Sequence, residues 1–214
     1  MSKGRSETED QARQLFRDQR NILDLIKEPK SRSGFEPAIH HLFGDKRQRG
    51  KTARIVNHEF LFSGVKKDLV SFLPVNWRKE LDKINVTWRG CENWWLGYPF
   101  VALMELKVSD DGIKGHLKLN AEVGPLSEHN VRKRIIVTIT QAALAKNFDR
   151  IQFPADALDK GRLYSRFLRR NSIAVNDIRD TDEMEKKFEQ LIADFEPEFD
   201  LVASLIPELS DELP

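Results

Sequence analysis

The sequence has one cysteine, no long apolar run and almost no net charge, and each of these absences excludes a class of protein. Cys91 has no second cysteine with which to form an intramolecular disulfide, which argues against a disulfide-stabilised secreted fold. No apolar segment approaches the roughly 18 residues that a membrane span requires. Residues 1–10 are polar and lack the apolar centre of a secretory signal. We therefore expect a cytoplasmic protein that does not associate with a membrane.

The charged residues are nearly balanced in number but unevenly distributed along the chain. Lysine and arginine number 35 and aspartate and glutamate 34, so the formal net charge of +1 argues against nucleic-acid binding through overall charge. Basic residues cluster at 46–54, 132–134 and 162–170, whereas 177–212 is strongly acidic. This asymmetry leaves room for a local phosphate-binding surface.

The 214 residues suit one large domain with an N-terminal extension. Apolar residues at helical spacing predict an amphipathic helix over 9–27, which Pro29 ends. Residues 30–52 are rich in serine, glycine, proline and basic side chains and are interpreted as a mobile, partly ordered connector, in which Phe35, Ile39, Leu42 and Phe43 could form a short helix. We expect an N-terminal helix and basic connector over 1–54 and an α+β domain over 55–214.

A two-stranded hairpin over residues 98–123 is the best-defined element. Alternating apolar residues give each strand one apolar face, and Asp111-Gly112 favours a two-residue type I′ turn. This register sets Val108 opposite Gly115 and Met104 opposite Leu119. A slip of one residue would place an apolar face against a polar one, so the pattern selects the register.

The remaining elements surround this hairpin. The sequence predicts strands at 55–62, 84–89, 151–153 and 173–175, a helix or strand at 65–72 and a helical turn at 77–81. Helices are expected at about 128–147, 159–170 and 181–206, with Ser127 and Asp180 as N-caps and Pro197 as an interruption. The predicted fold is α+β, with an antiparallel sheet centred on the hairpin and packed by these helices.

Three residues of the hairpin could form a catalytic site. Glu105 and Lys107 lie on one face of their strand, in the Glu-x-Lys arrangement that PD-(D/E)XK nucleases use, and Glu122 could add a second carboxylate for Mg²⁺. A cross-strand ion pair explains the same residues without a metal, because the register places Glu105 opposite Lys118 and Lys107 opposite His116. The histidines show no zinc-ligand spacing, so no cofactor is expected unless the protein is a Mg²⁺-dependent nuclease.

Two basic groups and an aromatic group are candidates for binding nucleic acid. The start of the helix after Ser127 would attract an anion, the helix at 159–170 would carry a basic stripe, and tryptophans before the hairpin could stack on bases. The candidate residues are Arg132, Lys133, Arg134, Arg162, Arg166, Arg169, Arg170, Trp94 and Trp95.

Residues 72–206 resemble the C-terminal accessory region of some bacterial PD-(D/E)XK-superfamily proteins. The motifs that carry the resemblance are Phe72-Leu73-Pro74-Val75-Asn76-Trp77, Trp94-Trp95-Leu96-Gly97-Tyr98, and Leu117-Lys118-Leu119-Asn120-Ala121-Glu122-Val123-Gly124-Pro125 followed by Arg132 or Arg134. In those relatives a nuclease core lies upstream, and no such core is evident here. The resemblance implies an accessory or regulatory protein of phage–host conflict or antiviral defence.

The leading interpretation is a non-catalytic binding protein that engages nucleic acid or a nucleic-acid-processing partner. The first alternative is a divergent Mg²⁺-dependent nuclease that uses Glu105, Lys107 and Glu122. The second is a protein-interaction inhibitor or adaptor that docks through the acidic C-terminal helix. No feature of the sequence fixes an oligomeric state.

Overall fold

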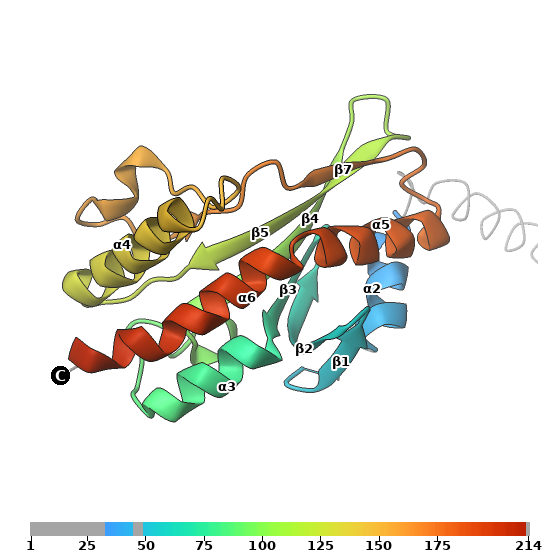
Figure 1. Ribbon diagram of the computed structural model, residues 1–214. Helices are drawn as coiled ribbons and strands as arrows, with labels where there is room; N and C mark the ends of the chain where they lie inside the picture. The colour runs from blue at the N-terminus through green and yellow to red at the C-terminus, as the bar shows by residue number, and fades with distance from the viewer. Residues whose placement is uncertain (1–32, 45–48, 213–214) are drawn as a thin grey trace, which may run out of the picture. The chain divides into compact units, whose positions relative to one another are not determined.

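The computed structural model describes residues 33–44 and 49–212. Its strands form one antiparallel sheet, and helices pack against it (Figure 1). The helix expected at 9–27 lies outside these residues. The 7-stranded sheet has the order β1-β2-β3-β4-β5-β6, and β7 pairs with β5 beside β6. The strands are β1 (Thr52–Ile55), β2 (His58–Lys66), β3 (Leu69–Pro74), β4 (Phe100–Val108), β5 (Gly115–Val123), β6 (Ser165–Arg166) and β7 (Ser172–Val175). The predicted α+β class and the central position of the hairpin are confirmed.

The hairpin β4–β5 has the register that its sequence predicts. Val108 lies opposite Gly115, Met104 opposite Leu119 and Phe100 opposite Val123. The predicted type I′ turn is wrong. It requires a positive φ at both central residues, and only Gly112 has one, at 67°.

The hairpin tip is instead a wider loop organised by one carboxylate. The amide of Ser109 donates to the carbonyl of Lys114 at 2.9 Å, and the amide of Gly112 donates to the carbonyl of Ser109 at 3.0 Å. Asp111 Oδ1 accepts from the amides of Ile113 and Lys114, both at 2.9 Å. Because aspartate can bind the amides that follow it, Asp111 stabilises this loop without adopting a left-handed conformation.

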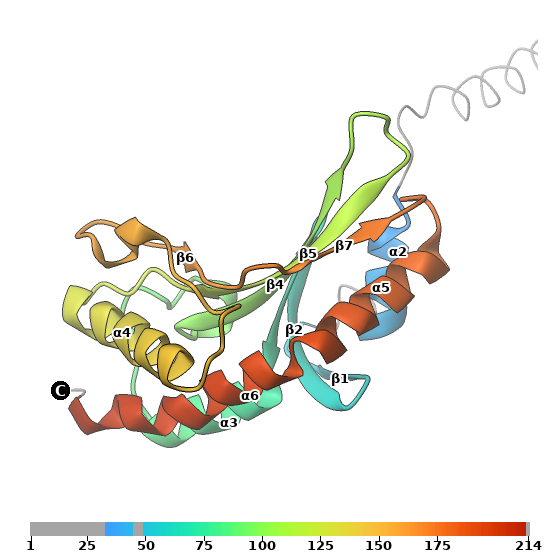
Figure 2. The same ribbon diagram turned by 45° about the horizontal axis from the view of Figure 1, so that its top comes forward.

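Helices cover one face of the sheet. They are α3 (Val75–Ile84), α4 (His129–Ala145), α5 (Thr181–Asp194), α6 (Glu196–Leu205) and α2 (Phe35–Phe43), and they lie on the same side in both views (Figures 1 and 2). Phe100, Met104, Leu117 and Leu119 point toward these helices and are buried. The period-2 pattern of the hairpin therefore supplies the centre of the core.

Helix α2 belongs to this core, and it forms at the residues for which the sequence allowed a short helix within the expected connector. Phe35, Ile39 and Phe43 are buried. The centroid of the Phe43 ring lies 5.4 Å from the ring centroid of Phe62 and 5.8 Å from that of Phe188. Residues Ser33–Pro214 form one compact unit. The described part of the expected connector thus helps to build the domain.

The predicted helix at 159–170 is wrong. Gly161 has a φ of 91°, and the chain then becomes extended as β6, which pairs with the end of β5. The amide of Phe167 donates to the carbonyl of Ala121 at 3.0 Å. An edge strand with unpaired backbone groups outweighs a helical side-chain pattern, because those groups gain hydrogen bonds only from an extended partner.

Other expectations divide in the same way. Helices α4, α5 and α6 confirm the segments expected at 128–147 and 181–206, and Asp180 caps α5 by accepting from the amide of Glu183 at 3.0 Å. Ser127 is not the cap of α4, whose N-cap is Glu128. The strand expected at 84–89 does not form, because Asn85 ends α3 in a left-handed conformation. The strand expected at 55–62 is split by a turn into β1 and β2.

In the segments that the structure describes, no helix combines the length and the apolar character needed to cross a membrane.

Candidate functional site

The face of β4 and β5 that the helices leave uncovered carries charged side chains. We call it the polar face and define it by Glu105 and Lys107 on β4 and by His116, Lys118 and Glu122 on β5. These residues alternate with the core positions, so they point away from the helices. The sequence-predicted catalytic residues therefore lie on one surface.

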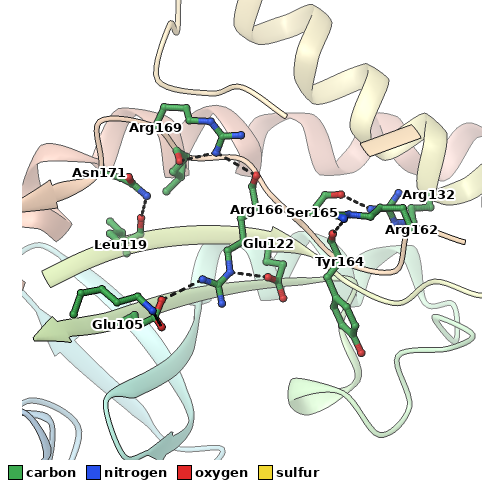
Figure 3. A network of polar contacts seen from close by, with 12 residues as sticks. Glu105, Leu119, Glu122, Arg132, Arg162, Tyr164, Ser165, Arg166, Arg169 and Asn171 are labelled. Carbon is green, nitrogen blue, oxygen red and sulfur yellow. Dashed lines mark hydrogen bonds and ion pairs between the residues drawn. The ribbon is translucent and has the colours of Figure 1, made fainter. Parts of the chain in front are cut away.

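Arg166 of β6 holds the two carboxylates of this face. Its Nε lies 2.9 Å from Glu122 Oε2, and its Nη1 lies 3.3 Å from Glu105 Oε2. Figure 3 shows the guanidinium between the two carboxylates, with the Tyr164 side chain extending on the same side of the strands. The Lys107 ammonium also binds Glu105. Burial raises the pKa of Glu105, but Lys107 and Arg166 outweigh this effect and hold that pKa below its usual value.

This network argues against a metal-dependent nuclease site. Glu105 and Glu122 are brought together, but the cation between them is Arg166, and a divalent ion there would be repelled by it. Among residues 33–44 and 49–212, no group of three or more metal-ligating side chains is close enough to hold an ion. The expected cross-strand positions of Lys118 and His116 are confirmed, although Glu105 pairs with Lys107 on its own strand.

A pocket of about 800 Å³ opens on the polar face beside Glu122. Its charged and polar lining includes Arg49, Ser63, Lys66, Glu122 and Arg166. This volume lies within the range of ~300 to ~1,000 Å³ that is typical of ligand sites.

Aromatic side chains form one wall of this pocket. Trp94, Trp95 and Tyr164 line it, and the Trp94 and Tyr164 ring centroids are 6.0 Å apart. The Trp94 ring packs on Gly124, where a Cβ would lie 2.1 Å from a ring atom. Tyr164 is 43 % exposed, so its ring offers apolar area to a ligand.

The segment that carries the tryptophans has a strained backbone. Trp95 and Leu96, in the 3-10 turn η2 (Trp95–Gly97), have φ values of 31° and 69°. A non-glycine residue with a positive φ costs on the order of 1–3 kcal/mol, and such residues are concentrated at functional sites. Of these two residues, Trp95 lines the pocket.

Basic side chains lie at the opening. The amide of Gly50 donates to the carbonyl of Phe62 at 2.8 Å, which fixes Arg49 beside β2, and Lys66 ends that strand. Both side chains are exposed. Within the described part of the chain neither forms an ion pair, so their charges are available to an anion.

The basic cluster at the start of α4 is divided between surface and core. Arg132 is only 2 % exposed, and its Nη2 donates to Ser165 Oγ at 2.6 Å. Lys133 is exposed, and Arg134 Nη2 donates to the carbonyl of Glu208 at 3.1 Å. Arg132 therefore binds the chain around β6 and is unavailable to a nucleic acid.

The other predicted basic residues do not form a stripe, because the helix that would carry them is absent. Arg162 pairs with Asp156 at 3.0 Å, Arg170 pairs with Asp149, and Arg169 Nη1 donates to the carbonyl of Leu168 at 3.1 Å. Of this group, the structure places only Arg166 in the pocket.

Several carboxylates of the acidic C-terminal segment bind other parts of the chain. Glu196 Oε1 lies 2.8 Å from His58 Nε2, and Glu198 Oε2 lies 2.6 Å from Arg150 Nη2. Glu183 accepts from the amide of Asn176 at 3.1 Å. These acidic groups therefore have structural roles and are not all available to a docking partner.

Cys91 is buried, as expected for a structural thiol. Burial, with a smaller contribution from Glu92, raises the pKa of its thiol to about 12. A thiol with this pKa is a poor nucleophile near neutral pH, because the thiolate is the reactive form.

Sequence reasoning missed Ser63, Lys66 and Tyr164. Ser63 lines the pocket at a β-bulge between Phe62 and Gly64, and no residue pattern in β2 signals that bulge. Tyr164 lies in the segment 159–170, for which the sequence incorrectly predicts a helix. Arg49 belongs to a basic cluster that the sequence does show.

No family model matches the sequence, and the searches of curated proteins and of solved structures return no match. The resemblance to a PD-(D/E)XK accessory region therefore stays a prediction.

Proposed function

We propose that the protein is a non-catalytic binding protein that engages single-stranded nucleic acid through the polar face of its sheet. The observation that carries this proposal is the pocket in which Trp94, Trp95 and Tyr164 lie beside Arg49, Lys66 and Arg166. Aromatic rings stack on unpaired bases and basic side chains bind the backbone, which is the usual chemistry of single-strand recognition.

The charges of the face favour an anion. Glu105 and Glu122 are neutralised by Lys107 and Arg166, so they do not cancel the charges at the opening. Arg49 and Lys66 are thus the cations nearest the pocket whose charge is not used within the described structure. A single strand fits better than a duplex, because stacking on a ring requires an unstacked base.

The test is the affinity of labelled single-stranded DNA and RNA, measured by fluorescence anisotropy. The double variant Arg49→Ala/Lys66→Ala should bind about tenfold more weakly, and its salt dependence should fall by about 1.4 in log–log slope for two lost phosphate contacts. Lys186→Ala removes one charge from the exposed surface of α5; it is the control for a lysine outside the pocket and should bind like the wild type. Equal binding by the double variant would contradict the proposal.

Lys133→Ala separates the two candidate surfaces. It removes the exposed charge of the α4 cluster that the sequence first suggested. A loss of affinity in Lys133→Ala with none in Arg49→Ala/Lys66→Ala would move the binding surface to α4.

The same samples with Mg²⁺ or Mn²⁺ test the absence of catalysis. The oligonucleotides should stay intact, because Arg166 and Lys107 hold the carboxylates that a metal would need. Cleavage that Glu105→Gln abolishes would establish the nuclease alternative instead.

A further inference from the structure

The floor of the pocket contains a buried polar group with no partner. Ser63 is 3 % exposed, lines the pocket and is the extra residue of the β-bulge in β2. Its hydroxyl has no hydrogen-bond partner among residues 33–44 and 49–212. An unsatisfied buried hydroxyl is destabilising, so a ligand that binds it would recover this cost.

A carboxylate also lines the pocket, on β5, which β3 and β4 separate from β2. Glu122 is 8 % exposed, and the Arg166 Nε bond to its Oε2 fixes its orientation. Within the described segments, its Oε1 receives no hydrogen bond. An ionised carboxylate only accepts hydrogen bonds, so Glu122 favours a ligand edge rich in donors.

The aromatic and the basic side chains of the pocket favour two further chemical groups in a ligand. Trp95 and Tyr164 offer ring area to a flat group, and Arg49 and Lys66 are exposed cations of the lining that would attract a phosphate. A flat group joined to a phosphate, with donors on its far edge, matches a nucleotide.

Glu122 distinguishes among the bases. Guanine has two adjacent donors, N1–H and the N2 amino group, which can both bind one carboxylate such as that of Glu122. Adenine and cytosine place an unprotonated ring nitrogen beside their amino group, and this nitrogen would repel Glu122. Uracil and thymine have one donor between two carbonyl oxygens.

We infer that this pocket takes one unstacked guanine nucleotide of the bound strand, with its donor edge on Glu122. The inference rests on the proposed function, since it assigns a base preference to the same surface.

The test compares oligothymidine with strands in which one central base is guanine, adenine or hypoxanthine. The wild type should bind the guanine strand about tenfold more tightly than the adenine strand, as expected for a bidentate base contact. Hypoxanthine keeps N1–H but lacks the amino group, so its strand should have an intermediate affinity. This comparison uses only the wild-type protein and does not depend on the folding of a variant.

A substitution of Glu122 then tests whether this residue causes the preference for guanine. Glu122→Gln should lose the guanine preference, because its amide presents a donor to a donor edge, whereas Glu189→Gln on the exposed surface of α5 should keep it. Equal affinity for all strands, or a guanine preference that persists in folded Glu122→Gln, would overturn the inference and leave the proposed function standing. Absence of binding to every strand would overturn both.

Discussion

Neighbouring residues of one basic cluster have opposite roles at the scale of single side chains. Arg132 is buried, and its Nη2 binds Ser165, whereas Lys133 is exposed to solvent. A cluster of like charges in a sequence therefore does not identify a surface, because the period of the helix sends successive residues in different directions. Arg166 also has a structural role, because its guanidinium orients Glu105 and Glu122.

Substitutions of Arg132 and Lys133 distinguish a side chain that stabilises the fold from one that lies on the surface. Arg132→Ala should lower the free energy of unfolding by about 3 kcal/mol, because it removes a buried side chain together with its hydrogen bonds. Lys133→Ala should change it by less than about 0.5 kcal/mol. Chemical denaturation measures both values, and similar losses would show that the burial of Arg132 has no energetic weight.

Glu105 predicts a dependence of stability on pH. Its pKa is below the ordinary value of 4.5 in the folded protein, so it contributes stability above that value, and this stability is lost as the pH falls through the folded pKa. Glu105→Gln should therefore lose less stability than the wild type as the pH falls below 4.5. Parallel curves of unfolding free energy against pH for the two proteins would contradict the role of Lys107 and Arg166.

The elements show which parts of the fold a single sequence can predict. The register of β4–β5 was predictable because two period-2 apolar faces must coincide, and the start of α5 was predictable because Asp180 is a strong cap. The segment at 159–170 was not, since its conformation is decided by the unpaired edge of β5, which is distant in sequence. The pocket was not predictable either, because it depends on a bulge and on segments that meet only in the folded chain.

The loop of β4–β5 gives a prediction at this scale. Gly112→Ala should lower the free energy of unfolding by about 1 kcal/mol, because Gly112 has a φ of 67° and a side chain there is strained even in open space. Gly64→Ala is the control, since its Cβ also meets nothing within 4 Å but its φ is not in the left-handed region. Equal effects of the two substitutions on thermal unfolding would show that the loop tolerates another turn type.

At the scale of the whole molecule, the core includes residues from the segment expected to be an N-terminal helix and basic connector. Helix α2 and strand β1 pack on the core and on β2, and residues from Ser33 onward form one compact unit. A buried aromatic cluster that includes Phe43, Phe62 and Phe188 joins α2 to the sheet and to α5. The cluster therefore includes a residue that precedes the boundary expected at residue 55.

Two fragments test this boundary. A chain of residues 33–214 should unfold cooperatively, whereas a chain of residues 55–214, the domain expected from the sequence, should lack cooperative unfolding because the partners of Phe43 become exposed. Calorimetry of the two fragments measures the difference. Cooperative unfolding of 55–214 at an unchanged temperature would restore the sequence-based boundary.

The central claim is that the polar face of the sheet binds single-stranded nucleic acid. Ultraviolet cross-linking of a single-stranded oligonucleotide to the wild-type protein, followed by mass spectrometry of the peptides, tests it directly. We expect cross-links in the peptides that contain Trp94, Trp95 and Tyr164, because these rings line the pocket. Cross-links confined to the peptides of α4 or α5, on the opposite side of the sheet, would contradict the claim.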